Sequence, residues 1–199
     1  MIRPILLGVV LLGLGGCATL TVREPMPSDP ELQQQLLGRW RCIAPRQVKE
    51  APQSEGQSKP EDERGWLDVQ PSGTVIVSDD QGGRPERFRV TMSRLDQRLL
   101  FFAQTAKPSS KPQWLVLGGA WEGEGFWMVM ASEYKNLHRA VRQGQVAGKA
   151  DRNGGVQLQV PARQLPALIA RYGQHWFDPK DAIHCVRDVN EKPAKEASA

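Results

Sequence analysis

The chain has 199 residues, of which 40% are hydrophobic and 24% are charged, and its mean hydropathy is −0.46. This composition excludes a disordered chain, a collagen-like repeat and a polytopic membrane protein, and it fits one soluble domain. The 26 Lys and Arg residues against 22 Asp and Glu give a net charge of +4, a surplus too small and too evenly spread to indicate nucleic-acid binding. Three cysteines are too few for a disulfide-dense miniprotein.

The first residues have the three parts of a secretory signal. Arg3 gives a basic start, residues 5–14 form an apolar run, and Gly15 and Gly16 are small residues at the expected cleavage point. The run of about ten residues is shorter than the ~20 that a membrane-spanning helix needs. We therefore predict a signal peptide over residues 1–16 and no permanent transmembrane anchor.

The four residues Leu14-Gly15-Gly16-Cys17 resemble the lipobox of bacterial lipoproteins. The resemblance implies cleavage before Cys17, acylation of its thiol with a diacylglycerol and an amide-linked third chain, which together anchor a protein stably. Ala18 stands where an Asp usually marks inner-membrane retention, so the resemblance implies the periplasmic side of the outer membrane. The alternative is an ordinary cleaved signal with a chance cysteine.

Two cysteines remain after lipidation, Cys42 and Cys185. Because the periplasm is oxidising, we predict that they form one disulfide between the first core strand and the last. Closing so long a loop would stabilise the fold by about 4–5 kcal/mol in the chain-entropy model. A shared metal is a poorer interpretation, since the two sulfurs lack the short spacing of metal ligands.

The mature chain is expected to begin with a proline-containing tether over residues 17–29. A short helix follows, because Asp29 can cap it, Pro30 suits the first helical position, and apolar residues then recur on one face. Gly38 can end this helix in a left-handed conformation. We assign residues 30–189 to a single domain that contains a mobile loop over 45–64, and residues 190–199 to a disordered tail.

Strand patterns begin at Gly38. Ten segments are predicted: Gly38–Ala44, Trp66–Gln70, Thr74–Ser78, Arg87–Met92, Arg98–Ala103, Trp114–Leu117, Gly125–Ala131, Leu137–Arg142, Val156–Val160 and Ile183–Val189. The segments 99–103 and 126–131 are apolar at every position, as expected for strands covered on both faces. Gly- and Asn-containing turns at roughly ten-residue spacing indicate an antiparallel up-and-down meander, closed as a β-barrel or folded as a small sandwich. One late α-helix is predicted over residues 162–172.

The sequence Leu36-Leu37-Gly38-Arg39-Trp40 resembles the Gly-x-Trp signature of lipocalins and related calycins. In that family a short helix precedes the signature, hairpins build an eight-stranded barrel, and a late helix comes before a final short strand. The resemblance implies a calycin-like barrel that holds an apolar or amphipathic ligand. The chain lacks the family's Thr-Asp-Tyr type motif, and other small β-barrels share this order of elements.

Candidate catalytic and metal-binding groups are sparse. Ser132 with Glu133 and His138 is the nearest approach to a nucleophile grouping, and a solvated strand end is the simpler interpretation. His138, His175 and His184 form no pair with metal-ligand spacing, and the acidic pairs 79–80 and 122/124 fit exposed turns. We therefore predict no catalytic residue, no metal and no cofactor, and a protein that is not an enzyme.

Six tryptophans are the most informative side chains: Trp40, Trp66, Trp114, Trp121, Trp127 and Trp176. Large rings can line a ligand cavity, or they can simply pack a core. If a cavity exists, its predicted walls are Trp66, Phe102, Trp114, Trp127 and Met130. This first hypothesis describes a non-catalytic lipoprotein that binds a lipid-like ligand in its barrel.

The second hypothesis rests on arginines. The series comprises Arg84, Arg87, Arg89, Arg94 and Arg98, with Arg139 and Arg142 further along the chain. Arg87 and Arg89 share one face of a strand, where guanidinium groups could bind an anionic surface or a periplasmic protein partner. The protein would then be an interaction lipoprotein such as an assembly accessory, an inhibitor or an immunity protein. A solvated outer face is the plainer alternative.

Overall fold

The computed structural model describes residues 19–44, 63–80, 82–105 and 113–188. The predicted signal peptide, Cys17, most of the 45–64 loop and the 190–199 tail lie outside the described residues. The strands are β1 (Leu20–Val22), β2 (Gly38–Ala44), β3 (Glu63–Val69), β4 (Thr74–Asp79), β5 (Glu86–Leu95), β6 (Arg98–Thr105), β7 (Trp114–Glu122), β8 (Gly125–Met130), β9 (Gly148–Ala150), β10 (Val156–Leu158) and β11 (Ile183–Arg187). The helices are α2 (Pro30–Leu36), α3 (Lys135–Arg142) and α4 (Leu165–Tyr172), with single 3₁₀ turns at Ala162–Gln164 and Pro179–Asp181.

Eight strands form a closed antiparallel barrel. Strands β2 to β8 follow one another as a meander, and β6 pairs with β7, so the sheet curves without a break. The last strand, β11, fills the remaining gap between β8 and β2. The predicted mainly β meander is confirmed, and of the two predicted closures the barrel is the one that forms.

The barrel forms because its strands alternate between interior and exterior side chains. In β5, for example, Phe88 and Met92 point inward and are buried, whereas Arg87 and Arg89 point outward and are exposed. The predicted helix before the barrel is confirmed as α2. The Asp29 carboxylate accepts a hydrogen bond from the Leu32 amide at 3.0 Å, as a capping side chain does.

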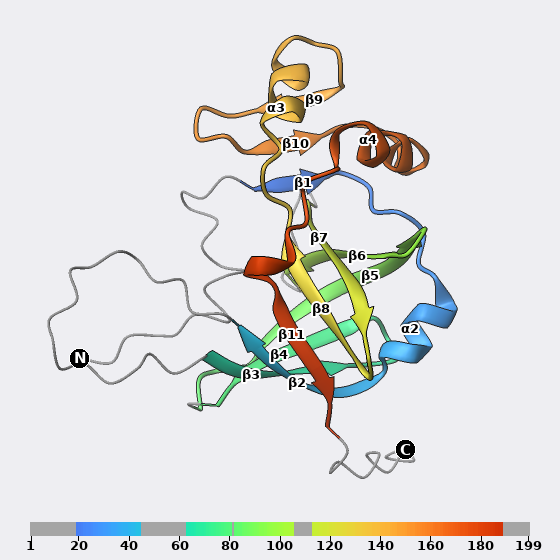
Figure 1. Ribbon diagram of the computed structural model, residues 1–199, viewed down its shortest axis with the longest axis vertical. Coiled ribbons are helices and arrows are strands. Elements are labelled where there is room, and N and C mark those ends of the chain that lie inside the picture. Colours follow the sequence, from blue (N-terminus) through green and yellow to red (C-terminus); the bar gives the residue numbers. More distant parts are fainter. Residues whose placement is uncertain (1–18, 45–62, 81, 106–112, 189–199) are drawn as a thin grey trace, which may run out of the picture.

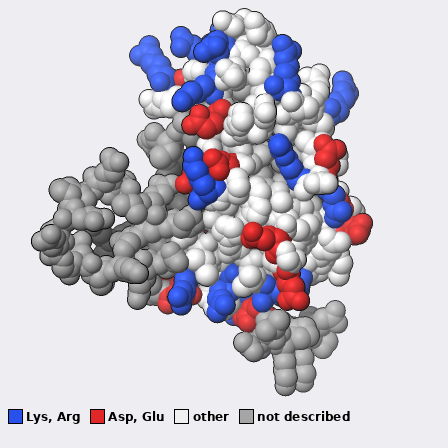
Figure 2. Space-filling view, in the orientation of Figure 1, with Lys and Arg blue, Asp and Glu red and all other residues white. Residues whose placement is uncertain are grey.

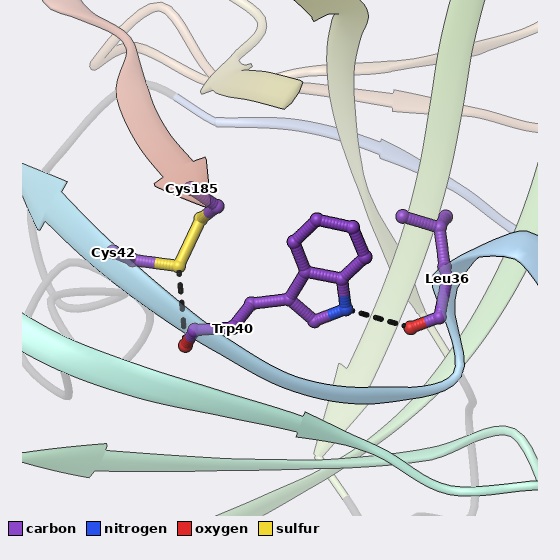
Figure 3. The surroundings of a disulfide bond; sticks show 4 residues. All are labelled: Leu36, Trp40, Cys42 and Cys185. Carbon is purple, nitrogen blue, oxygen red and sulfur yellow. Dashed lines mark hydrogen bonds between the residues drawn. A yellow bond between two sulfur atoms is a disulfide. The ribbon is translucent and has the colours of Figure 1, made fainter. Parts of the chain in front are cut away.

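One end of the barrel is held together by Trp40 and the disulfide (Figure 3). The Trp40 indole donates a hydrogen bond to the Leu36 carbonyl at 2.8 Å and so fastens β2 to the end of α2. Cys42 and Cys185 face each other across the β2–β11 pair and are joined, at a sequence separation of 143. The predicted disulfide between the first and last barrel strands is thus confirmed.

A second group of elements covers the outside of β6 and β7. It consists of β1, α3, β9, β10 and α4, which Figure 1 shows together at one end of the molecule, and we call it the cap. Strand β1 pairs antiparallel with β7 and parallel with β10, so it links the cap to the barrel. A second hydrophobic core fills the space between the two parts, with Phe102, Trp114 and Trp176 among its members.

Strand β6 separates these two cores. Leu99 and Phe101 point into the barrel, whereas Leu100 and Phe102 point into the second core. The uninterrupted apolar sequence of this strand, predicted to be covered on both faces, is therefore explained by the cap.

Two predictions about the cap are wrong. Residues 19–29 are not simply a tether, because Leu20–Val22 forms β1 and is buried at every position. The segment Leu137–Arg142 is not a strand but most of α3, whose buried residues Leu137, Ala140 and Val141 recur at the three- and four-residue spacing of a helix. The remaining predicted strands overlap observed strands, and the predicted helix over 162–172 is a 3₁₀ turn followed by α4.

Candidate functional surfaces

The barrel interior is filled by large side chains. Trp40, Phe101 and Phe126 form a chain of ring contacts, with centroids 5.0 Å apart for Trp40 and Phe126 and 5.9 Å apart for Phe101 and Phe126. Aliphatic residues from every side pack around them, and Leu32 and Leu36 of α2 join the same core. Each of these residues is almost fully buried, so the described interior is a packed core.

The five residues predicted to line a cavity do not meet in one place. Phe102 and Trp114 lie outside the barrel wall, in the second core. Trp66 and Trp127 are half-buried on strands whose neighbouring residues Leu67 and Phe126 are buried in the barrel core. Met130 packs at the edge of the barrel core. The structure thus brings together only Phe102 and Trp114.

A small cavity of about 10 Å³ lies in the second core, between the outer barrel wall and α4. Its lining includes Phe102 and Trp176, and it is just large enough for one water molecule. The Trp176 Nε1 group is buried and has no hydrogen-bond partner among the described residues. A lipid-sized ligand does not fit in this space.

The predicted arginine pair belongs to a larger surface, which we call the arginine face. It lies on the outside of β2, β3, β4 and β5, and its members are Arg39, Arg41, Trp66, Ile76, Arg87 and Arg89. Cross-strand register places Asp68 between Arg39 and Ile76, with Arg87 next in the same row. The Arg39 guanidinium also stacks over the Trp66 ring at 4.4 Å.

The register explains why this face was only partly predicted. Arg87 and Arg89 are two residues apart, so their shared orientation follows from the period of a strand. Arg39 and Trp66 are far apart in sequence, and only the pairing of β2 with β3 brings them together. Arginine and tryptophan are enriched at the centres of protein interfaces, so this combination suits a protein partner.

A second charged surface lies on α3, and we call it the cationic helix face. Lys135, His138, Arg139 and Arg142 occupy successive turns on one side of the helix, and they line a shallow hollow of about 440 Å³ together with Gln143. The opposite side of α3 is buried against the second core. Arg139 and Arg142 belong to the predicted arginine series, but a strand over Leu137–Arg142 would not group them with Lys135 and His138, and the observed helix does.

The candidate catalytic groups are engaged in structural contacts. His138 Nε2 lies 2.9 Å from the Asp151 carbonyl, and Ser132 Oγ donates to the Trp176 carbonyl at 3.5 Å. His184 Nδ1 lies 2.9 Å from the Glu122 carboxylate on the surface. Asp79 accepts a hydrogen bond from the Gly83 amide, as a turn residue does. Within the described part of the chain, no three His, Cys, Asp or Glu residues gather as a metal site would require.

Tyr134 is the buried titratable group of the cap. Burial raises the pKa of its phenol to about 12, and the nearby negative charge of Asp151 adds to this effect. The hydroxyl is buried without a hydrogen-bond partner among the described residues. It therefore stays neutral at physiological pH and acts as a core side chain of the cap.

The fold and these surfaces define a class: a disulfide-linked, eight-stranded antiparallel β-barrel with a packed interior and a cap of helices and short strands. No protein-family model, curated protein or solved structure matches the chain. No helix in the described ranges has the length and apolar character to cross a bilayer. The disulfide is typical of proteins outside the cytoplasm.

Proposed function

We propose that this protein is a non-catalytic lipoprotein, anchored by an acylated Cys17 on the periplasmic side of the outer membrane, that binds a partner protein through its arginine face. The anchor rests on the lipobox resemblance, and the disulfide supports an oxidising compartment. The observation that carries the interaction role is the contrast between a packed interior and an exterior on which arginines and Trp66 gather. Binding through the surface is therefore favoured over a ligand inside.

The Gly-x-Trp resemblance supplies the alternative. A barrel is compatible with ligand binding, and a calycin-like protein would hold an apolar or amphipathic molecule in it. In this chain, Trp40 packs at the barrel end, and both it and its neighbours in the barrel core are almost fully buried. We therefore assign the ligand hypothesis second place, to be tested on the same preparation.

Site-specific photo-crosslinking in the cells that make the protein tests the interaction role. A photoreactive residue in place of Arg89 should give one discrete crosslinked product, and the same residue in place of the exposed Glu124 in the β7–β8 turn is the matched control. The product should disappear when Arg41→Glu is added to the Arg89 probe. Equal crosslinking from both positions, or none from position 89, would refute a partner on the arginine face.

Mass spectrometry tests the anchor and the alternative together. The intact mature protein should begin at Cys17 and carry acyl mass at that residue. A mature chain without that mass would remove the membrane anchor from the proposal. Native spectra of gently extracted protein should show no lipid-sized adduct, and a consistent adduct would restore the ligand-binding hypothesis.

A further inference from the structure

The surplus positive charge of the chain is concentrated in one part of the fold. Residues 131–182 contain eight Lys and Arg residues against four Asp and Glu, which is the entire net charge of +4. The expectation of an even charge distribution is therefore wrong. Figure 2 shows these Lys and Arg side chains around the end of the molecule that the cap forms, at the top of the view.

Helix α3 presents part of this charge as an ordered stripe. Lys135, His138, Arg139 and Arg142 follow the spacing that aligns side chains along one side of a helix. Leu137, Ala140 and Val141 on the opposite side are buried in the second core. This packing fixes the rotation of the helix, so its basic side chains face solvent. The residues that line the hollow beside this stripe include no acidic residue, and Glu133, just before the helix, pairs with Lys135 at 3.6 Å.

The start of the described chain is linked to the same stripe through the turn between β9 and β10. Because β1 and β10 run parallel, Thr19 lies beside the turn that begins β10, and its carbonyl accepts a hydrogen bond from the Val156 amide at 2.8 Å. The same turn is tied to α3 by the 2.9 Å contact between His138 and the Asp151 carbonyl. Cys17 stands two positions before Thr19, and two positions of chain span at most about 7 Å.

We propose that the cationic helix face docks on the anionic phosphate headgroups of the membrane in which Cys17 is anchored. This inference rests on the anchor of the proposed function and adds an orientation to it: the cap faces the lipid and the arginine face of the barrel stays accessible. Because β1 begins only three positions after Cys17, an acyl group on Cys17 would hold the cap close to the headgroups. Guanidinium and ammonium groups suit phosphate, and each one near an anionic surface strengthens binding about fivefold.

Vesicle flotation tests the docking separately from the anchor. The mature chain, residues 17–199, carries Cys17→Ser so that no acyl group contributes. It should float with vesicles that contain about one third phosphatidylglycerol in phosphatidylcholine, and much less with phosphatidylcholine alone. Raising the salt concentration should release it, since exposed charges are screened.

A matched pair of variants assigns the surface. Arg139→Gln with Arg142→Gln should weaken partition about 25-fold, as expected for two fivefold contributions. Arg87→Gln with Arg89→Gln removes the same charge from the arginine face and should leave partition within about twofold of the parent. Retention of the disulfide and an unchanged far-ultraviolet spectrum establish that both variants are folded.

Three results would overturn the docking proposal. They are equal binding to charged and neutral vesicles, equal losses in the two variant pairs, and retention on a soluble polyanion without vesicle binding, which would point to an acidic macromolecule instead. None of them bears on acylation of Cys17 or on crosslinking at Arg89. Conversely, an unacylated Cys17 would remove the anchor while leaving the vesicle measurement of the cationic helix face intact.

Discussion

The Arg187 guanidinium lies over the Trp40 ring, with its carbon 4.6 Å from the ring centroid. The same group donates hydrogen bonds to the carbonyls of Leu37 at 3.0 Å and Gln35 at 2.6 Å, at the end of α2. Through these three contacts Arg187 connects β11, β2 and α2. The role of Arg187 could not be predicted from the sequence, because its partners are about 150 residues away in the chain.

Replacing Arg187 should loosen this end of the barrel. Arg187→Gln removes the stacking and the two donors to helix carbonyls, and we expect a loss of about 1–2 kcal/mol in the free energy of unfolding. Arg187→Lys should recover less than half, since an ammonium group lacks the fork that reaches both carbonyls. Urea unfolding measures both. Arg41→Gln is the control on the neighbouring strand, and an equal loss there would contradict a specific role for Arg187.

Removing the disulfide should cost considerably more. Cys42→Ser with Cys185→Ser releases a loop of 143 residues, for which the chain-entropy model gives about 4–5 kcal/mol. The melting temperature of the parent should fall in the presence of reductant, and that of the double variant should not respond to it. A parent melting curve that reductant leaves unchanged would refute a stabilising cross-link.

The strand in the predicted tether can be tested by truncating one side chain. Leu20→Ala should lower the free energy of unfolding by about 2–4 kcal/mol, because Leu20 is 1% exposed in the second core. Arg23→Ala, at an exposed position just after β1, should change it by less than about 0.5 kcal/mol. Thermal or urea unfolding distinguishes the two. Equal, negligible effects would mean that residues 19–23 serve only as a linker.

Tyr134 should make the cap sensitive to alkali. Its folded pKa of about 12 lies above the unfolded value of 10.0, so the native state retains a proton that the unfolded state loses. The stabilisation is complete below pH 10 and is lost as the pH rises towards 12, by about 1–2 kcal/mol. Tyr134→Phe should abolish this part of the pH dependence. It should also stabilise the protein by about 1 kcal/mol at pH 7, since it removes a buried hydroxyl without a partner.

Unfolding at a series of pH values from 7 to 12 makes that comparison. The Tyr172→Phe variant, which alters the other tyrosine of the chain at a half-buried position, would serve as a reference for general alkaline effects. A slope that remains unchanged in Tyr134→Phe would show that another group controls the alkaline transition.

The barrel was predictable because its signals are local. The alternation in β5, the N-terminal capping of α2 by Asp29 and the turns between hairpins each depend on residues a few positions apart. The continuous apolar sequence of β6 even predicted that something would cover the outside of the barrel. Only the identity of that covering structure was missing.

The cap was not predictable because its signals are short or ambiguous. A three-residue strand such as β1 contains too few positions to show a period, and its partners Val156–Leu158 are far along the chain. In α3, apolar and basic residues are interleaved so that a six-residue window suits either period. The candidate surfaces share this difficulty, since the arginine face requires the register of four strands.

The closing role of β11 has a consequence for biogenesis. Without it, β2 and β8 would each present an unpaired edge, and open edges invite pairing with other chains. The barrel therefore cannot close until nearly the whole polypeptide is available for folding. Under the proposed export, a partly translocated chain would be exposed to aggregation until its final strand arrives.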